Sequence, residues 1–412
     1  MRIIIAPDSF KESLSATEVA SAMAEGVLAG CKQASIDLCP MADGGEGTVE
    51  AMVAATGGQF RTADVFDPLG APIRARYGLL GTTSQANLPG EIGLIGAKLA
   101  TEGETGGATG KTAVIEMAAA SGLALVPLDK RDPRTTTTFG TGQLIIAALY
   151  DGATDLIIGI GGSATTDGGC GCAQALGVVF INADGEPAVC GLGGGALADI
   201  ARVDMTGRDP RIPDARIRVA CDVANPLTGP KGAARVYGPQ KGATPEIVDL
   251  LDDGLRHLAE VIRQSLGIDV EHMPGAGAAG GLGAGLVAFA GAKLESGVKI
   301  ISDAVGLAAR LVDADLCITG EGKLDSQSAH GKTAYGVAEL ARDAGVPVIC
   351  IAGVVEPDES HAIFVDVCAL VDGQVTVKQA MQTPQPLLVD RTAQAVRRFV
   401  KARGSKERHG SF

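Results

Sequence analysis

The chain has 412 residues, of which 46% are hydrophobic, 20% are charged and 3% are aromatic, with no Trp and a formal net charge of −13. This composition is typical of a folded globular protein, and the length favours two or three domains. The acidic balance and the few aromatic side chains argue against a nucleic-acid surface, which needs a basic stripe and rings for base stacking. An anionic substrate would therefore need cations placed locally, by Lys, Arg or a metal ion.

The nine cysteines indicate a reducing compartment. They are scattered through apolar stretches without a CxxC pair, and Cys170-x-Cys172 is too tight for a usual zinc pair. We expect reduced, buried thiols. The chain opens at Met1 directly into a strand pattern without a signal peptide, and no apolar run reaches the roughly 18–20 residues that span a bilayer. The sequence thus predicts a cytoplasmic protein with no membrane partner.

Short β-branched runs alternate with amphipathic helical patterns, which predicts an α/β architecture with parallel strands. The candidate buried strands are Arg2–Ala6, Asp155–Ile160, Ile217–Cys221, Asp315–Thr319 and Val346–Ala352. Several of these runs end in Gly, Asp or Ser, and ligands bind outside the carboxyl ends of parallel strands. Functional side chains are therefore expected just after these strands.

Helices are predicted over Ser15–Ala29, Pro245–Leu266 and Thr333–Ala344, and Ser15 with Glu18 forms a candidate capping box at the start of the first. Alternating polar and apolar residues over 61–80, around Asp67-Pro68-Leu69-Gly70, predict a β-hairpin. The segment 82–110 is rich in Gly and Thr and predicts an insertion or an extended surface loop.

The βαβ rhythm of the first residues returns from about Lys299. We therefore predict a discontinuous Rossmann- or flavodoxin-like parallel-sheet domain made of residues 1–62 and 290–412. A second α/β domain, residues 63–289, is inserted into it. The active site is expected in the cleft between the two domains.

Three glycine-rich acidic segments dominate the candidate site. They are Met41–Gly47, Gly159–Gly169 and Gly320–Asp325. Each places bare backbone N–H groups, which cradle anions, beside a carboxylate, which is a preferred ligand of Mg²⁺. This combination suggests phosphoryl transfer, although helix capping alone is a sufficient explanation of Asp43.

Two further motifs follow predicted strands. Ala6-Pro7-Asp8-Ser9-Phe10-Lys11 offers a carboxylate, a hydroxyl and an ammonium group, or else it forms a capped turn with a solvated Lys. Asp222, after the strand Ile217–Cys221, is placed as a general base, while an Asx-turn accounts for it equally well.

A rival interpretation is an NAD-dependent oxidoreductase of a small hydroxy acid. Gly159-x-Gly161-x-x-Ala164 and Gly275-x-Gly277-x-x-Gly280 match the dinucleotide fingerprint. However, the first continues into a breaker-rich polar loop, and the Pro before the second argues against a preceding central strand. Nucleotide contact and tight helix packing both remain open for the second. The P-loop spacing that ends in Gly331-Lys332-Thr333 fails, because Ser326 stands where its first Gly is required.

Taken together, these segments resemble the bacterial glycerate kinase type I family, in family order and over nearly the whole chain. The matching stretches are 6–11 with 14–16, 40–48, 112–123, 140–143, 160–165, 220–223, 275–283 and 320–327. Glu12 and Thr166 stand where the family more often shows Gly and Asn. The resemblance implies ATP-dependent phosphorylation of D-glycerate, normally to 2-phosphoglycerate, with Mg²⁺ required.

The resemblance and the motifs together suggest a role for each candidate residue. Asp222 would accept the proton of the substrate hydroxyl, and Lys11 with Lys323 would hold the glycerate carboxylate or the transferring phosphoryl group. Asp43 and Asp167 are the candidates for Mg²⁺. The candidates for glycerate binding are Asp8, Ser9, Glu46, Glu321 and Asp325. The candidates for the nucleotide phosphates are Gly161, Gly162, Ser163, Gly275, Gly277, Gly280 and Gly281.

Alternatives remain at this stage. The same site would also suit 3-phosphorylation of glycerate, and the rival classes are the oxidoreductase and a noncatalytic sensor of small acids. The sequence leaves a monomer and a homodimer equally open.

Overall fold

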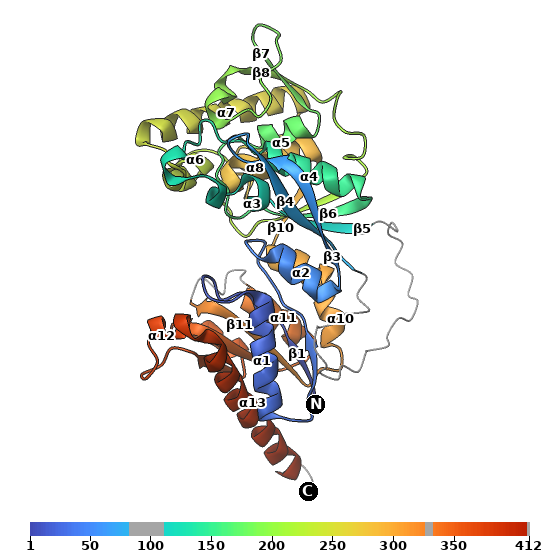
Figure 1. Cartoon of the computed structure of the whole chain (residues 1–412), viewed down its shortest axis with the longest axis vertical. Helices are drawn as coiled ribbons and strands as arrows, with labels where there is room; N and C mark the ends of the chain where they lie inside the picture. The colour runs from blue at the N-terminus through green and yellow to red at the C-terminus, as the bar shows by residue number, and fades with distance from the viewer. Residues whose placement is uncertain (82–110, 326–332, 410–412) are drawn as a thin grey trace.

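The computed structural model describes residues 1–81, 111–325 and 333–409 and shows two large β-sheets, each flanked by helices, and a small two-stranded sheet (Figure 1). The segment 82–110, predicted as an insertion, lies outside the described residues. The chain starts in the first sheet, passes into the second, and returns to the first. The mixed α/β architecture with parallel strands is confirmed.

The first sheet is entirely parallel and joins strands from both ends of the chain. Its order is β13-β12-β11-β1-β2. The strands are β1 (Arg2–Ile5), β2 (Ser35–Leu38), β11 (Leu316–Leu324), β12 (Val348–Val355) and β13 (Asp366–Ala369). Read from β2, this is the flavodoxin-like order 2-1-3-4-5, whose ligand-binding switch point falls between the first and third strands, here β1 and β11.

Successive residues of β1 face opposite sides of this sheet, and both sides are covered by helices. Ile3 and Ile5 pack towards α1 (Ala16–Gly30) and α13 (Pro384–His409), whereas Ile4 packs towards α9, α10 and α11. The ranges of these three helices are Gly297–Ala304, Leu307–Leu311 and Thr333–Asp343. A strand that is buried on both faces needs a continuous apolar run, which explains the sequence Ile3-Ile4-Ile5.

The predicted capping box at the start of α1 is confirmed. The backbone N–H of Glu18 donates to the Ser15 hydroxyl at 3.3 Å, and the Ser15 N–H donates to the Glu18 carboxylate at 2.8 Å. The box satisfies donors that every helix start leaves without intrahelical partners. It therefore fixes where α1 begins, directly after the loop that follows β1.

The second sheet is mixed, with the order β10-β9-β6-β5-β4-β3. Its strands are β3 (Gln59–Phe66), β4 (Pro72–Leu79), β5 (Lys111–Glu116), β6 (Ala153–Gly159), β9 (Arg216–Ala220) and β10 (Lys293–Glu295). Strands β5, β6, β9 and β10 run parallel. Strands β3 and β4 form the predicted antiparallel hairpin, in which the Gly70 N–H donates to the Asp67 carbonyl at 3.0 Å.

Helices also cover the second sheet. Its strands contact α2 (Thr48–Thr56), α3 (Ala118–Ser121), α4 (Phe139–Tyr150) and α8 (Ala278–Ala290). Helices α5 (Cys170–Ala175), α6 (Ala233–Tyr237) and α7 (Pro245–Leu266) pack against these helices and against one another. Helix α7 has the predicted bounds, with Thr244 as its N-cap and Gly267 in a left-handed conformation at its end. A small hairpin of β7 (Val179–Asn182) and β8 (Ile200–Asp204) packs beside α7.

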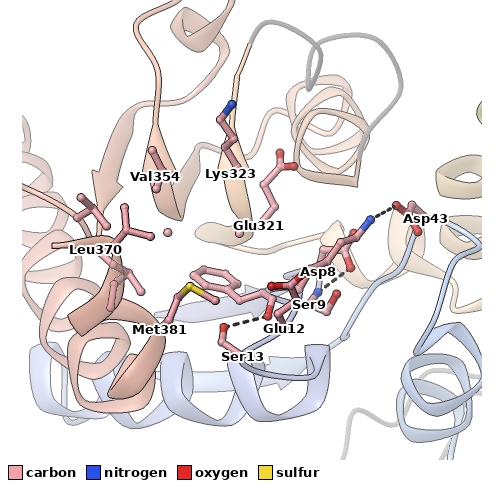
Figure 2. A pocket seen from close by; sticks show the side chains of 17 residues that line it. Asp8, Ser9, Glu12, Ser13, Asp43, Glu321, Lys323, Val354, Leu370 and Met381 are labelled. Carbon is pink, nitrogen blue, oxygen red and sulfur yellow. Dashed lines mark hydrogen bonds and ion pairs between the residues drawn. The ribbon is translucent and has the colours of Figure 1, made fainter. Parts of the chain in front are cut away.

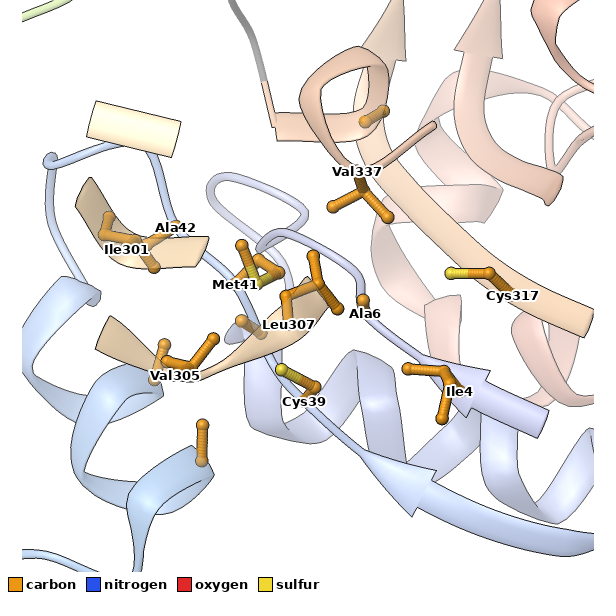
Figure 3. Close-up of a cluster of buried hydrophobic side chains, with 14 of the residues drawn as sticks. Ile4, Ala6, Cys39, Met41, Ala42, Ile301, Val305, Leu307, Cys317 and Val337 are labelled. Carbon is orange, nitrogen blue, oxygen red and sulfur yellow. The ribbon is translucent and has the colours of Figure 1, made fainter. Parts of the chain in front are cut away.

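One apolar core continues from the first sheet to the second. Near the first sheet, Ile4 and Cys317 lie with Ile301, Leu307 and Val337 from the covering helices (Figure 3). The same cluster extends to three residues of the second sheet, Val114, Ile157 and Ala220. Because buried apolar area is the dominant favourable term in folding, this shared core holds the two sheets together.

The strands that each sheet contains indicate where the domains meet. Strand β3 already belongs to the second sheet from Gln59, and β10 still pairs with β9 at Glu295. We therefore propose domain boundaries near residues 58 and 296, a few residues from the predicted 62 and 290. Strand β10 is only three residues long, which is why no apolar run in the sequence marks it.

The loop 43–47 lies against the carboxyl ends of β6 and β9. A Cβ atom added to Gly44 would lie 2.5 Å from the Ala220 Cβ, and one added to Gly159 would lie 2.4 Å from the Gly44 carbonyl oxygen. Real Cβ atoms do not approach other atoms so closely. Glycine is therefore required on both sides of this contact.

We predict that Gly159→Ala destabilises the protein by about 1–3 kcal/mol, because the added methyl group must push the Gly44 backbone away. Chemical denaturation would measure this change. The matched control is Gly373→Ala, since an added Cβ there meets nothing within 4 Å and the backbone is not left-handed. Equal effects of the two substitutions would contradict the close contact as the cause.

Candidate active site

The carboxyl ends of the parallel strands of both sheets meet at the loop 43–47. From the first sheet come the residues that follow β1 and those at the end of β11. From the second sheet come Gly161 and Gly297, which both lie close to this loop. A Cβ atom added to Gly161 would lie 3.2 Å from the Gly45 Cα, and one added to Gly297 would lie 2.2 Å from the Asp43 carbonyl oxygen. Asp43 thus lies between groups contributed by both sheets.

Lys11 and Asp43 form an ion pair at this junction. The Lys11 Nζ lies 3.3 Å from the Asp43 Oδ2, and the lysine side chain remains largely exposed (Figure 2). Asp43 is the main cause of the raised pKa of Lys11. The residue that follows, Glu12, has a φ of +66°, a conformation that favours Gly, which is the residue that the family resemblance predicts at this position.

Asp8 is a buried carboxyl group on the same loop. Its Oδ2 accepts a hydrogen bond from the Thr333 hydroxyl at 2.6 Å, and its Oδ1 accepts one from the Ser9 N–H at 2.6 Å. Burial, together with the nearby Asp43 carboxylate, raises the pKa of Asp8 to about 6. A partly protonated carboxyl group therefore lies next to the Lys11–Asp43 pair.

Asp222 follows β9 and is held from the opposite side. Its Oδ1 accepts a hydrogen bond from the Gly297 N–H at 2.9 Å, and the Ser296 side chain also donates to it. The side chain is open to solvent on one side, yet the surrounding protein and the Asp43 carboxylate raise the pKa of Asp222. A carboxylate with a raised pKa is better suited to accept a proton.

The end of β11 carries the three remaining charged candidates. Glu321 is buried, whereas Lys323 is exposed and its Nζ lies 3.2 Å from Asp325 and 2.8 Å from Glu356. These two carboxylates raise the pKa of Lys323. Asp325 is largely buried and contacts Lys323, so the structure places it behind the lysine.

A cavity of about 500 Å³ opens between the ends of β1, β11 and β12 and the region around α12 (Val377–Gln382). Its polar end is lined by Asp8, Ser9, Lys11, Asp43, Glu321 and Lys323 (Figure 2). The cavity thus brings together six of the predicted site residues, from segments more than 300 positions apart in the sequence. Its volume is within the usual range for small-molecule sites.

Glu46 is exposed at the junction, on the loop 43–47. It lies near Glu116, at the end of β5, and contributes to the raised pKa of Glu116, whose main cause is burial. The Glu116 carboxylate accepts hydrogen bonds from the backbone of Gly47 and from the Val49 N–H, the latter at 2.8 Å. Glu116 therefore fixes the loop 43–47 and the start of α2, a role that the sequence did not indicate.

The two glycine loops of the second sheet differ in accessibility. Gly161 and Gly162 are exposed beside the loop 43–47, and Ser163 is buried directly behind them. The exposed backbone of Gly161 and Gly162 suits an anion.

The four candidate glycines of the other loop, Gly275, Gly277, Gly280 and Gly281, are all buried. An added Cβ at Gly277 would lie 2.1 Å from the Pro226 carbonyl oxygen, and one at Gly280 would lie 1.9 Å from that of Thr165. Tight packing accounts for these glycines, so we withdraw their assignment to nucleotide phosphates.

Asp167 also requires a correction. It is fully buried, and its carboxylate accepts hydrogen bonds from the Thr138 N–H at 2.8 Å, the Thr138 hydroxyl at 2.7 Å, and the N–H groups of Gly169 and Gly171. Burial raises the pKa of Asp167. Four donors inside the protein occupy the carboxylate, so we assign Asp167 to holding its own loop and not to a metal ion.

Lys241 is a buried residue near the site that the sequence did not reveal. It is 1% exposed, and its Nζ donates hydrogen bonds to the Ser163 hydroxyl at 2.8 Å and to the Thr165 carbonyl at 2.6 Å. Burial lowers the pKa of Lys241 to about 7. Its local sequence, Gly238-Pro239-Gln240-Lys241-Gly242, is that of an ordinary surface turn and gave no signal.

The glycine pattern at Gly159 that matches the dinucleotide fingerprint is not followed directly by a helix. After β6 the chain runs through an irregular loop, and α5 begins only at Cys170. In dinucleotide-binding folds the fingerprint opens directly into a helix whose N-terminus faces the pyrophosphate. The geometry therefore does not support the oxidoreductase.

Comparisons with known proteins agree with this arrangement. The model of the glycerate kinase family matches residues 3–401. A glycerate 2-kinase of Escherichia coli (strain K12) is 51% identical over 87% of this chain and 86% of its own length. A glycerate kinase of Bacillus subtilis (strain 168) is 47% identical over 97% and 98%. The crystal structure of a protein described as glycerate kinase 2 from Salmonella typhimurium LT2 has a TM-score of 0.82 at 43% identity and covers 99% of both chains.

The fold and the site define an α/β phosphotransferase with its polar residues at the junction of two sheets. The chain belongs to the glycerate kinase family. It is accordingly an enzyme that transfers a phosphoryl group to an alcohol, with ATP as the donor. None of the helices in the described part of the chain is long and apolar enough to cross a membrane.

We predict that the carboxyl group of Asp8 makes the protein less stable as the pH rises. The pKa of Asp8 is about 6 in the folded protein, whereas the ordinary value, which applies to the unfolded chain, is 3.8. Between these values the folded state binds a proton that the unfolded state has lost. The free energy of unfolding should therefore fall by roughly 2 kcal/mol from pH 4 to pH 6, and by less than about 0.5 kcal/mol more above pH 6.

Asp8→Asn should remove this fall, because the amide does not titrate and its oxygen still accepts the hydrogen bond from Thr333. Chemical denaturation of both proteins between pH 4 and pH 7 measures the difference. Asp129→Asn, at an exposed position, is the control. The same pH slope in the wild type and in Asp8→Asn would show that Asp8 is not the titrating group.

Proposed function

We propose that the enzyme phosphorylates D-glycerate on its C2 hydroxyl, with Mg²⁺, at the junction between the two sheets. The observation that carries the proposal is the convergence of Lys11, Asp43 and Asp222 at one place, from the ends of strands in different sheets. Phosphoryl transfer needs mainly positioning and neutralisation of charge, and these residues supply both a cation and carboxylates. The name of the E. coli relative, glycerate 2-kinase, supports the C2 position.

The transfer step assigns a role to each of these residues. The C2 hydroxyl oxygen attacks the γ-phosphorus of ATP and forms a new P–O bond. The bond between the γ-phosphorus and the β–γ bridging oxygen breaks, and ADP leaves. Asp222 accepts the hydroxyl proton, and its raised pKa favours this. Lys11 neutralises charge on the transferring group, while Lys323 holds the glycerate carboxylate.

Two other sets of residues complete the proposed site. The exposed amides of Gly161 and Gly162, with Ser163 behind them, would receive the terminal phosphates of ATP. Asp8, Ser9, Glu46 and Glu321 lie around the glycerate as acceptors or donors for its hydroxyl groups. We propose Asp325 as a residue that orients Lys323, with which it forms an ion pair.

The residues present fit Mg²⁺. No cluster of three or more His, Cys, Asp or Glu side chains that could hold a metal lies within the described ranges. Mg²⁺ does not need one, because it usually binds through one or two carboxylates and completes its shell with water and substrate phosphate. Asp43, close enough to raise the pKa of both Asp8 and Asp222, is the carboxylate that we assign to it. When bound there, Mg²⁺ would neutralise phosphate charge.

We predict that Asp222→Asn lowers kcat by about 10²- to 10⁴-fold, the usual contribution of a general base. The affinity for ATP should stay unchanged, because the substitution removes only the acceptor of the hydroxyl proton. A coupled ADP-release assay and calorimetric titration with ADP measure the two quantities. Asp129→Asn should behave like the wild type, and turnover of Asp222→Asn near the wild-type rate would refute the assignment of the base.

The product identifies the reaction. Incubation of the wild-type enzyme with ATP, Mg²⁺ and D-glycerate should give 2-phosphoglycerate, identified by the ³¹P–¹H coupling in NMR spectra. A 3-phosphoglycerate product would overturn the C2 assignment while leaving the kinase activity in place. Full activity in the presence of a chelator would overturn the role of Mg²⁺.

A further inference from the structure

The cavity that contains the polar residues also has an apolar end, which the chemistry of glycerate does not use. It is lined by Val354, Leu370, Val371, Val377, Ala380 and Met381, opposite Asp43 (Figure 2). Glycerate has three carbon atoms, each bearing oxygen, so it cannot cover this apolar surface. A second chemical group of the reactants must account for it.

The position of the apolar end within the fold points to a ligand. It lies beyond the carboxyl ends of β12 and β13, on the side of the first sheet where ligands of flavodoxin-like folds bind. Val377 and Met381, both on α12, are 51% and 46% exposed. Their exposed apolar surface faces the same cavity as Leu370, which is fully buried.

We propose that this apolar end, formed by Val354, Leu370, Val377 and Met381, binds the adenine ring of ATP. Adenine has two flat apolar faces that such side chains can cover. The phosphates would then pass Lys11, beside the glycerate in the polar end of the same cavity, and point towards Gly161 and Gly162 across the loop 43–47. This inference rests on the proposed function and adds to it a subsite in the first sheet's domain.

The test uses the double variant Val377→Asn with Met381→Gln. Both replacements are neutral, so they do not repel phosphate, and both positions are exposed, so the fold should persist. We expect the Kd for ADP, measured by calorimetry, to rise about tenfold or more, and the KM for ATP to rise with it. The KM for D-glycerate should stay within about twofold. Val365→Asn is the matched control, because Val365 is an exposed apolar residue of the same domain, 59% accessible, outside the cavity.

An unchanged Kd for ADP, or a rise confined to the KM for glycerate, would overturn the adenine subsite. Calorimetry with ADP does not require turnover. Loss of ADP affinity in the double variant thus supports the subsite even if the wild-type enzyme yields a different phosphoglycerate. Conversely, a kinase whose double variant binds ADP normally retains the proposed function and lacks this subsite.

Lys241 carries a second, independent inference. A buried lysine is rare unless it is paired, because an unpaired ammonium loses its hydration. Within the described residues Lys241 forms no ion pair, and Ser163 and Thr165 offer it only neutral oxygen atoms. Asp167 is the one charged group that acts on it, and the Asp167 carboxylate is already bound by four donors. An anion on the exposed side of Gly161 and Gly162 would favour the protonated form of Lys241.

We infer that Lys241 is a positioning residue for the phosphates of ATP. It holds the Ser163 loop from behind and, in its protonated form, places a positive charge there. Lys241→Met, which keeps the length of the side chain, should raise the KM for ATP at least tenfold and leave the KM for D-glycerate within about twofold. Its unfolding temperature should not fall, since the variant removes a buried charge.

A merely structural lysine would instead lower the unfolding temperature and change both KM values, and that result would overturn the inference. If Lys241→Met does not fold, Ser163→Ala removes only the hydroxyl that Lys241 holds. It should raise the KM for ATP selectively, and an unchanged KM for ATP in Ser163→Ala would equally overturn it.

Discussion

The close contact between the loop 43–47 and the ends of β6 and β9 is the constraint on which the site depends. No Cβ atom fits at Gly44 or Gly159, so two backbones touch where side chains would ordinarily keep them apart. This contact brings Asp43 between Lys11 on one side and Asp222 on the other. The apolar core that the two sheets share holds them in place at this contact, and the hydrogen bonds accepted by Glu116 fix the loop.

Positively charged side chains lie at this junction although the protein as a whole is negatively charged. The chain carries a net charge of −13, and the junction itself contains several carboxylates. Burial, together with the nearby Asp43 carboxylate, raises the pKa of Asp8 and so disfavours its ionised form. Lys11 and Lys323 supply positive charge at the cavity, and Lys241 supplies it, when protonated, from its buried position behind the glycine loop. A polyanionic nucleotide thus meets local cations although the protein as a whole repels it.

Much of the fold follows from sequence patterns that have a local cause. Apolar runs such as Ile3-Ile4-Ile5 specify buried parallel strands, the Ser15–Glu18 capping box fixes a helix start, and Asp67 with Gly70 specifies a tight turn. The short strand β10 escapes such patterns, because three residues are too few to show one. The return of the chain to the first sheet could be predicted because strand and helix signals recur after a long interval.

The site was less predictable, because the same residue pattern serves different physical purposes. A glycine that lets a backbone approach a ligand and one that lets it approach another backbone look alike in a sequence. Only the contacts of Gly277 and Gly280 show that packing requires them. Likewise, Asp167 lies in an acidic glycine-rich segment like Asp43, and only its burial among four donors distinguishes the two. Lys241 is the converse case, since its burial depends on long-range packing that no local pattern encodes.

The pairing of β1 with β11 has a consequence for how the protein is made. Ile4 lies opposite Cys317 in the sheet, so β1, which pairs with β2 on its other side, lacks this second neighbour until most of the chain has left the ribosome. The parallel strands β5, β6 and β9, by contrast, follow one another within about a third of that length and can pair earlier. Because distant contacts form late and domains fold as units, the inserted domain should be ordered first. The catalytic junction, which needs both ends of the chain, is then the last part of the molecule to be completed during synthesis.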